Sequence, residues 1–277
     1  MNKMVLPLSG SEPIFDPRDY SIVGFNCYDY AIGFQDKRNN KKPHDEKSAP
    51  GARVGKPVAN LKNCKDVKKG ILSDNPKKVY ACKDPQQRCK TGYYKIMCFI
   101  APDKGDGNAD FHFYRQVSTC RYKIQEGNTI YGLADYFHVK PAVILAAAKK
   151  LKTPTNRVDG NINSNSNESN SKMNKSNSTS KKSKYDALLK VGKIIEFPCN
   201  LWAHKQGWGT RPKIVDAAGK VITDPRKCMR NYAANGGMNY KVLCGTYCVS
   251  AKGAKSGLNA GQIRNVIANS KFSKNLF

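Results

Sequence analysis

The sequence predicts an α+β fold built around a small antiparallel sheet. Residues 92–117 alternate between apolar and polar side chains on both sides of a turn rich in Gly and Asp, which is typical of two antiparallel strands. Residues 240–249 are strand-like as well. Between them, residues 120–148 change from one short alternating segment to two segments with helical spacing. With 277 residues, the chain can hold one or two domains with their own cores.

A first helix is predicted to begin near the N-terminus, within residues 26–32. Asn26 is of a type that caps helices, and Tyr30 and Ala31 stand at helical spacing from Cys27.

The second strand of the 92–117 pair alternates between two sets of side chains. One set comprises Phe111, Phe113 and Arg115, and the other comprises His112, Tyr114 and Gln116.

The helices of residues 120–148 have recognisable start signals. A strand through Tyr122 and Ile124 ends at the turn of residues 126–128, and Thr129 follows as a helix N-cap. Pro141 suits the first turn of the second helix. The apolar positions are Ile130, Leu133, Ala134 and Phe137 in the first helix and Val143, Ile144, Ala147 and Ala148 in the second.

Downstream, residues 188–199 and 201–207 are predicted to be two further strands. Residues 153–184, rich in Asn, Ser and Lys, are predicted to be a disordered linker, because they hold too few apolar side chains to offset the entropy cost of ordering. Residues 251–277 form a basic C-terminal tail with one short amphipathic segment, residues 262–268. Docking of this tail on a partner and a frayed terminus are equally compatible with the sequence.

The order strand–helix–helix in residues 120–148, closed by the pattern Val-Gly-x-Ile-Ile-x-Phe-Pro in residues 188–199, resembles the LysM module. The resemblance implies an inserted βααβ domain over residues 119–200 that binds N-acetylglucosamine polymers such as chitin and peptidoglycan. In LysM domains one glycan-binding loop joins the first strand to the first helix. Here it corresponds to Glu126, Gly127, Asn128, Thr129 and Ile130. The linker displaces the second glycan-binding loop.

Three short motifs resemble the papain-like fold, and most closely its cell-wall amidases and peptidases. They are FNCYDYA with Cys27, DFHFYRQ with His112 and LWAHKQG with His204. The resemblance implies a papain-like domain made of residues 15–118 and 201–250. In it, Cys27 would be the nucleophile, His112 the base and His204 the group that orients the base. Together with an Ala-Pro-Gly element at residues 49–51, this layout resembles a domain of large DNA viruses of algae and amoebae.

The chemistry of such a site is well defined. A helix N-terminus favours the thiolate form of a cysteine, and a neighbouring histidine can accept the thiol proton. The alternative is that Cys27 is a small buried hydrophobic residue and that His112 and His204 are satisfied by local hydrogen bonds.

The ten cysteines admit several interpretations. Residues 1–13 hold no apolar stretch adequate for a secretory signal, so reduced thiols are the default expectation. No Cys-x-x-Cys pair occurs, and the sequence predicts neither a metal site nor a cofactor. Cys120 and Cys199 border the insert, whose ends should lie close together. A disulfide between them is therefore predicted in an oxidised particle.

The formal net charge of +27 favours electrostatic partners, namely nucleic acid without sequence preference, an anionic membrane or acidic protein surfaces. No nucleic-acid-binding motif is present, and the longest apolar run, residues 142–148, is too short to cross a bilayer.

Two functional classes follow from these observations. The first is a virion-associated minor capsid protein of a large DNA virus, assembled in the host cytoplasm with other capsid or virion proteins and carrying the LysM-like module on a papain-like scaffold. The alternative is an active cell-wall amidase or endopeptidase that uses Cys27, His112 and His204. Glycan binding without catalysis lies between the two.

Overall fold

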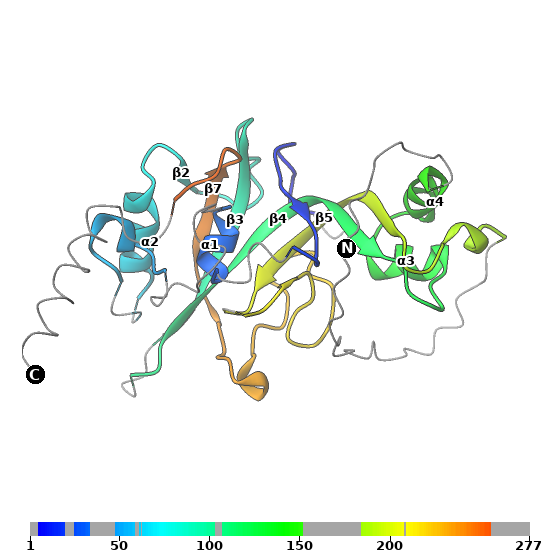
Figure 1. Cartoon of the computed structure of the whole chain (residues 1–277). Coiled ribbons are helices and arrows are strands. Elements are labelled where there is room, and N and C mark those ends of the chain that lie inside the picture. The colour runs from blue at the N-terminus through cyan, green and yellow to red at the C-terminus, as the bar shows by residue number, and fades with distance from the viewer. Residues whose placement is uncertain are drawn as a thin grey trace, which may run out of the picture. The chain divides into compact units, whose positions relative to one another are not determined.

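The computed structural model describes residues 5–19, 25–33, 48–58, 61, 63–102, 107–151, 184–207 and 209–255. It is a mixed α/β structure with an antiparallel sheet and few helices, in agreement with the predicted α+β class (Figure 1). Almost all of the predicted linker, the tail beyond residue 255, and with it the segment 262–268, lie outside the described residues.

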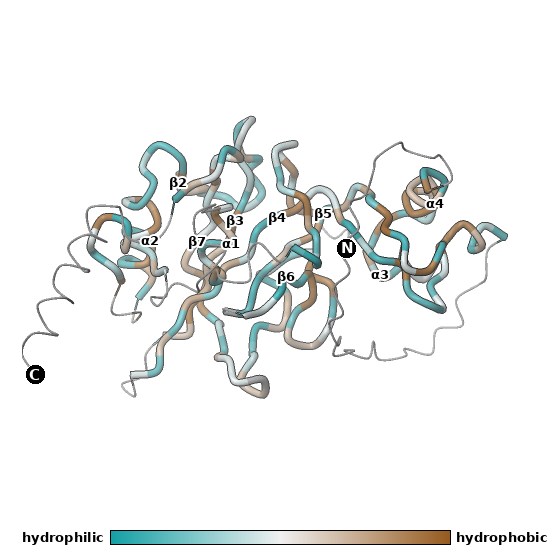
Figure 2. The backbone as a smooth tube through the Cα atoms, viewed as in Figure 1, coloured by the Kyte–Doolittle hydropathy of each residue, from teal (hydrophilic) through white to brown (hydrophobic). Residues whose placement is uncertain are grey.

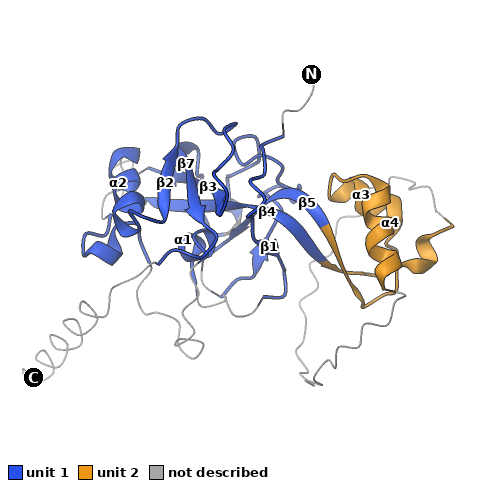
Figure 3. Cartoon of the chain, turned by 90° about the horizontal axis from the view of Figure 1, so that it is seen from above, with its two compact units in different colours: residues 1–121, 198–277 blue, residues 122–197 orange. Residues whose placement is uncertain are grey.

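The chain forms two compact units (Figure 3). Unit 1 comprises residues 1–121 and 198–277, and unit 2 comprises residues 122–197. The chain passes from unit 1 into unit 2 within strand β4 (Asp110–Lys123) and returns within strand β5 (Ile194–Lys205).

The described part of the chain contains a seven-stranded sheet in the order β2-β7-β3-β4-β5-β6, with β1 paired to β4 in parallel. The pairs β2–β7, β3–β7, β3–β4 and β5–β6 are antiparallel. The other strands are β1 (Ile14–Phe15), β2 (Val79–Cys82), β3 (Tyr93–Ala101), β6 (Pro212–Lys213) and β7 (Val242–Ser250). Helices α1 (Cys27–Ala31) and α2 (Cys64–Asp74) belong to unit 1, and α3 (Ile130–Tyr136) and α4 (Pro141–Lys150) belong to unit 2.

Strand β3 is buried along almost its whole length, which agrees with its apolar sequence from Ile96 onward. Figure 2 colours each residue of the backbone by its hydropathy. Ile96 and Cys98 face a core shared with α1 and α2, whereas Met97 and Phe99 face a second core around Trp202. Covering both faces of the central strand holds the surrounding strands in a fixed position.

Three contacts fix helix α1 to this sheet and to helix α2. The Tyr28 hydroxyl donates to Asp74 at 3.0 Å, and the Tyr94 hydroxyl donates to the carbonyl of Ala31 at 2.9 Å. The Arg115 guanidinium lies 3.7 Å from the centre of the Tyr30 ring and donates to the Tyr30 carbonyl at 2.9 Å. The helix is therefore anchored along its whole length, although it has only five residues.

The structure differs from the sequence prediction in the lengths of two strands. Residues 110–123 form one strand, β4, and residues 194–205 form one strand, β5, where shorter strands separated near residues 118 and 200 were predicted. Polar side chains bridge the predicted breaks: Gln116 donates to the Asn200 side chain at 2.8 Å, and both donate to the carbonyl of Leu6. Strand pairing thus continues through positions whose side chains resemble those of loops.

Six of the ten cysteines form disulfides, so the default expectation of reduced thiols does not describe this structure. The pairs are Cys64–Cys244, Cys89–Cys248 and Cys120–Cys199, and the cysteines outside disulfides are Cys27, Cys82, Cys98 and Cys228. The Cα atoms of Cys120 and Cys199 are 6.0 Å apart.

Removing the Cys120–Cys199 bridge by a double serine substitution should lower the free energy of unfolding by about 2–4 kcal/mol, because the bridge closes a long loop and restricts the unfolded chain. Denaturant titration under non-reducing conditions measures this, with Cys228→Ser as the matched control at a free cysteine. An unchanged midpoint in the double variant, or alkylation of Cys120 and Cys199 in the unfolded wild-type protein without prior reduction, would contradict the prediction.

Unit 2 has the strand–helix–helix–strand order expected from its sequence. The backbones of Ile124 and Lys193 pair at 2.8 Å, which joins the end of β4 to the start of β5. Phe137 follows α3 and contacts Tyr122, Tyr136 and Phe197 at ring-centre distances of 5.3, 4.8 and 4.9 Å. This aromatic cluster supplies much of the small core.

Candidate active site

Unit 1 contains a cleft of about 940 Å³ that borders two of the three predicted catalytic residues, Cys27 and His112. The remaining walls come from the N-cap of α1, from the start of β4 and from the segments after β5 and before β7. They include Asn26, Asp110, Phe111, Gln206, Gly207, Thr210, Tyr232, Met238, Tyr240 and Lys241.

Asn26 holds the start of α1 in place beside the cleft. Its side-chain oxygen accepts from the backbone N–H groups of Tyr28 and Asp29 at 2.9 and 3.1 Å, and the Asp29 carboxylate accepts from the Asn26 N–H at 3.1 Å. The Asn26 amide also donates to the carbonyl of Ser48 at 2.6 Å. Because the cap takes these N–H groups and Asp29 adds a negative charge, the helix itself gives Cys27 little help in forming a thiolate.

The Cys27 side chain is only 4% exposed. Its sulfur lies 3.6 Å from the carbonyl oxygen of Phe111, the residue that precedes His112. Cys27 packs on the Phe111 and Phe113 face of β4, and strand alternation places His112 on the opposite face with Tyr114. Cys27 and His112 both border the cleft, because the cleft opens at the first residues of β4.

His112 and His204 form a direct contact between neighbouring strands. Nε2 of His112 lies 2.8 Å from Nδ1 of His204, and Nε2 of His204 lies 2.8 Å from the carbonyl oxygen of Val215. The carbonyl can only accept, so Nε2 of His204 carries the proton. Burial lowers the pKa of His204 to about 4, so its Nδ1 has a free lone pair at neutral pH.

This arrangement determines the tautomer of His112. His112 donates from Nε2 to His204, which leaves the Nδ1 of a neutral His112 without a proton. Nδ1 is therefore the nitrogen of His112 that carries the lone pair, and it is the atom through which a general base would act. His204 is fully buried and does not line the cleft, so it meets the cleft only through its contact with His112.

Aromatic rings hold the His112 ring from several sides. Tyr240 packs against it at 4.9 Å and 30°, with Tyr114 and Tyr232 at 5.0 and 5.7 Å. The Tyr240 hydroxyl donates to Asp110 at 2.8 Å. Rotation of the imidazole is therefore restricted by packing as well as by the hydrogen bond to His204.

Sequence reasoning did not identify Lys205, which follows His204 and is fully buried. Its ammonium donates to the carbonyl of Gly207, a residue of the cleft wall. Burial lowers the pKa of Lys205 to about 8, while the neighbouring Cys27 and Asp29 act in the opposite direction. The only sequence signal would have been a lysine at an otherwise apolar strand position.

Protonation of His204 should make the free energy of unfolding depend on pH. The folded protein disfavours protonated His204, so the unfolded chain binds more protons between about pH 4 and pH 6.5. About 3 kcal/mol of stability is therefore present above pH 6.5 and lost as the pH falls toward 4. Denaturant titrations across this range should show a steeper loss for the wild type than for His204→Asn. Parallel curves for the two proteins would refute the assignment.

The predicted glycan-binding loop of unit 2 is ordered by its own hydrogen bonds. Thr129 caps α3 by accepting from Gly132 at 3.0 Å, and Asn128 accepts from the Gln125 N–H at 2.8 Å. Glu126 and Gly127 are exposed, with Gly127 in the left-handed region at φ 78°. Ile130 differs from the rest: its side chain is 3% exposed, so it belongs to the core and not to a ligand surface.

The described residues contain no group of three or more His, Cys, Asp or Glu side chains that could hold a metal ion. No helix in the described ranges is long and apolar enough to cross a bilayer.

Comparisons with family models, with curated proteins and with solved structures found no match to this chain.

Proposed function

We propose that unit 1 is a cysteine-dependent hydrolase of amide bonds. Cys27 attacks the carbonyl carbon, and His112 takes the thiol proton and returns it to the departing amine. Water then attacks the thioester, with His112 again as the base, and releases the acid and free Cys27. His204 keeps His112 in the required tautomer throughout.

One observation carries this proposal: the hydrogen-bonded chain from Val215 through His204 to His112, which ends beside the cleft that also holds Cys27. A purely structural histidine pair would not need an open cleft at its end. The base is in turn oriented by a third group, which is the general pattern of nucleophilic catalysis in enzymes.

The resemblance of unit 2 to LysM supports wall polymers as the substrate. A module of this kind would hold the protein on a glycan through Glu126, Gly127, Asn128 and Thr129 while unit 1 cleaves an amide bond nearby. A single module binds weakly, so the cleft has to contribute to recognition. Amide bonds in a peptidoglycan-like polymer are therefore the proposed substrate, in keeping with the likeness of unit 1 to papain-like wall amidases.

Thiol labelling combined with turnover tests the proposal. The purified protein should release new amino groups from peptidoglycan, and iodoacetamide should stop this release in step with alkylation of Cys27. Peptide mapping would compare the labelling rates of Cys27 and Cys228, a half-buried thiol whose pKa burial raises to about 11. Labelling of Cys27 no faster than Cys228, without any amine release, would exclude an activated nucleophile.

A second candidate, a minor capsid protein of a large DNA virus, is favoured by a different observation. Cys27 is almost completely buried and contacts a carbonyl oxygen, as an inert structural thiol would. Three disulfides and a net charge of +27 would suit a particle that persists outside cells and meets acidic partners. Absence of amine release, together with recovery of the protein in purified particles, would favour this role.

A further inference from the structure

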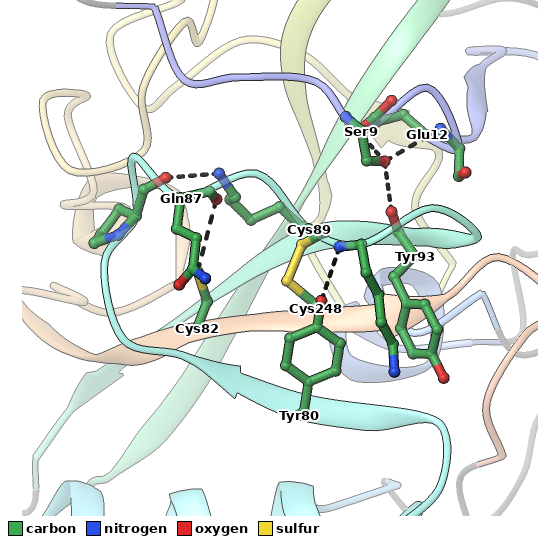
Figure 4. The surroundings of a disulfide bond; sticks show 12 residues. Ser9, Glu12, Tyr80, Cys82, Gln87, Cys89, Tyr93 and Cys248 are labelled. Carbon is green, nitrogen blue, oxygen red and sulfur yellow. Dashed lines mark hydrogen bonds between the residues drawn. A yellow bond between two sulfur atoms is a disulfide. The ribbon is translucent and has the colours of Figure 1, made fainter.

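A cluster of three cysteines lies in unit 1, separate from Cys27. Cys82, Cys89 and Cys248 form a small buried cluster, against which Tyr80 and Tyr93 pack (Figure 4). Cys89 and Cys248 are joined by a disulfide, and Cys82 beside them is a free thiol. Cys82 is the most exposed of the three, at 8% compared with 3% and 1%.

Strand register places Cys82 on the same face as the bridge. Tyr80 on β2 is directly opposite Cys248 on β7, and Cys82 is two residues further along β2. Side chains two residues apart in a strand point to the same side. Cys82 and Cys248 are therefore diagonal neighbours on two paired strands.

Cys89 is held differently, in the loop of residues 83–92 between β2 and β3. The Cys82 thiol is directed toward this loop: it donates to the carbonyl of Asp84 at 2.9 Å and lies 3.8 Å from that of Gln87. Cys89 is thus the one cysteine of the cluster that lies in a loop, and Cys82 already contacts this loop.

Lys95 supplies a positive charge to this cluster. It is 1% exposed, lies directly opposite Cys248 on β3, and its ammonium donates to the carbonyl of Pro85 at 2.6 Å. The charge of Lys95 opposes the rise that burial causes in the pKa of Cys82. The other charged groups that act on Lys95 are Glu12, Asp84 and Arg226.

We propose that these residues form a thiol–disulfide exchange site, in which Cys82 takes the bridge to Cys89 and releases Cys248. The Cys82 thiolate attacks the sulfur of Cys89, the Cys89–Cys248 bond breaks, and a Cys82–Cys89 bond forms. Cys248 leaves as a thiolate next to Lys95 and takes up the proton that Cys82 lost, through solvent. The number of disulfides and the oxidation state of the protein do not change.

This direction of attack follows from which parts can move. Cys82 and Cys248 are both fixed by strand pairing, and diagonal positions are separated by about 7–8 Å, which is long for a disulfide. Bridging Cys82 to Cys89 needs only a rearrangement of the 83–92 loop. The leaving group, Cys248, lies directly opposite Lys95 on the neighbouring strand, so a positive charge is carried by a residue paired with it.

The test starts from the full-length native protein held at mildly alkaline pH without added reductant. After an acid quench, free thiols are alkylated and the disulfide peptides are mapped. We expect a Cys82–Cys89 peptide and an equal amount of alkylated Cys248 to appear in the wild type and in Cys228→Ser, and to be absent in Cys82→Ser. Finding only Cys89–Cys248, or a Cys82–Cys248 peptide, would overturn the proposal.

Three further variants keep the test informative. In Cys248→Ser, a small-molecule disulfide such as oxidised glutathione should oxidise Cys82 and Cys89 to one bridge and be reduced to its thiols in doing so. Lys95→Met should slow the wild-type exchange about tenfold at neutral pH and shift its rate profile to higher pH, while Lys95→Arg should restore it. Two free thiols in Cys248→Ser, or an unchanged rate in Lys95→Met, would count against the proposed roles.

Discussion

Replacing Cys27 with alanine should reduce amide hydrolysis by about 10³-fold or more, because the covalent step loses its only nucleophile. His112→Ala should cost a similar factor, since Cys27 and His112 act as one unit and their losses do not add. Both substitutions remove side chains at the cleft without touching the His204 contact to Val215.

Two substitutions at His204 separate its effect on the orientation of His112 from its effect on packing. His204→Asn keeps an oxygen that can accept from Nε2 of His112, whereas His204→Leu cannot accept a hydrogen bond. We expect the leucine variant to lose about 10²-fold in kcat with little change in KM, and the asparagine variant to retain more activity. Steady-state kinetics measures both, with Cys228→Ser as the control outside the cleft. Full activity in Cys27→Ala would rule out the covalent mechanism.

Replacing Asp74 with alanine should destabilise unit 1 by about 3–5 kcal/mol, the largest loss expected from a polar substitution here. Asp74 is 4% exposed and accepts from the Tyr28 hydroxyl at 3.0 Å and from the N–H groups of Gly51 and Arg53 at 2.8 and 3.0 Å. Alanine would leave these donors buried without an acceptor, including a hydroxyl that has no access to water.

Asp74→Asn is the conservative comparison, because one side-chain oxygen remains as an acceptor. Burial raises the pKa of Asp74, so a neutral side chain is better tolerated there than at an exposed site. We expect a loss of about 1–2 kcal/mol for Asn and under about 0.5 kcal/mol for Asp66→Ala, at an exposed position on the same helix. Equal midpoints for Asp74→Ala and Asp66→Ala in denaturant titrations would show that the network contributes nothing.

Asp74 also connects the stability of unit 1 to the position of Cys27 in the cleft. Through Tyr28 it holds α1, whose first residue is Cys27, and through Gly51 it holds the neighbouring turn. Gly51 has φ 88°, and a Cβ there would lie 2.2 Å from the carbonyl oxygen of Lys56, so only glycine fits. Asp74→Ala should therefore reduce turnover as well, even under conditions in which the protein remains folded.

Local sequence signals predicted much of this fold. Thr129 and Pro141 mark the starts of α3 and α4, and the alternation of residues 111–116 predicted the strand that carries His112. These features depend on neighbours within a few residues, which is what a single sequence encodes most directly.

The features that were missed depend on weaker or more distant signals. Helix α2 has Gly70 in its interior and little apolar content, although Asn63 caps it and Val67, Ile71 and Asp74 repeat at helical spacing. The bridges of Cys64 and Cys89 join residues 180 and 159 positions apart, and no local pattern specifies such pairs. Tyr232 and Tyr240 reach the His112 ring from irregular backbone, where periodicity gives no prediction.

Every disulfide in the structure joins a cysteine before residue 121 to one after residue 198. A protease that cut the backbone once anywhere between these positions would therefore produce two polypeptides that remain one covalent molecule. The two halves of the cleft, with Cys27 and His112 on one polypeptide and Gln206 and Tyr240 on the other, would stay together after such processing. In a reducing environment the same cut would leave only non-covalent contacts to hold the two polypeptides together.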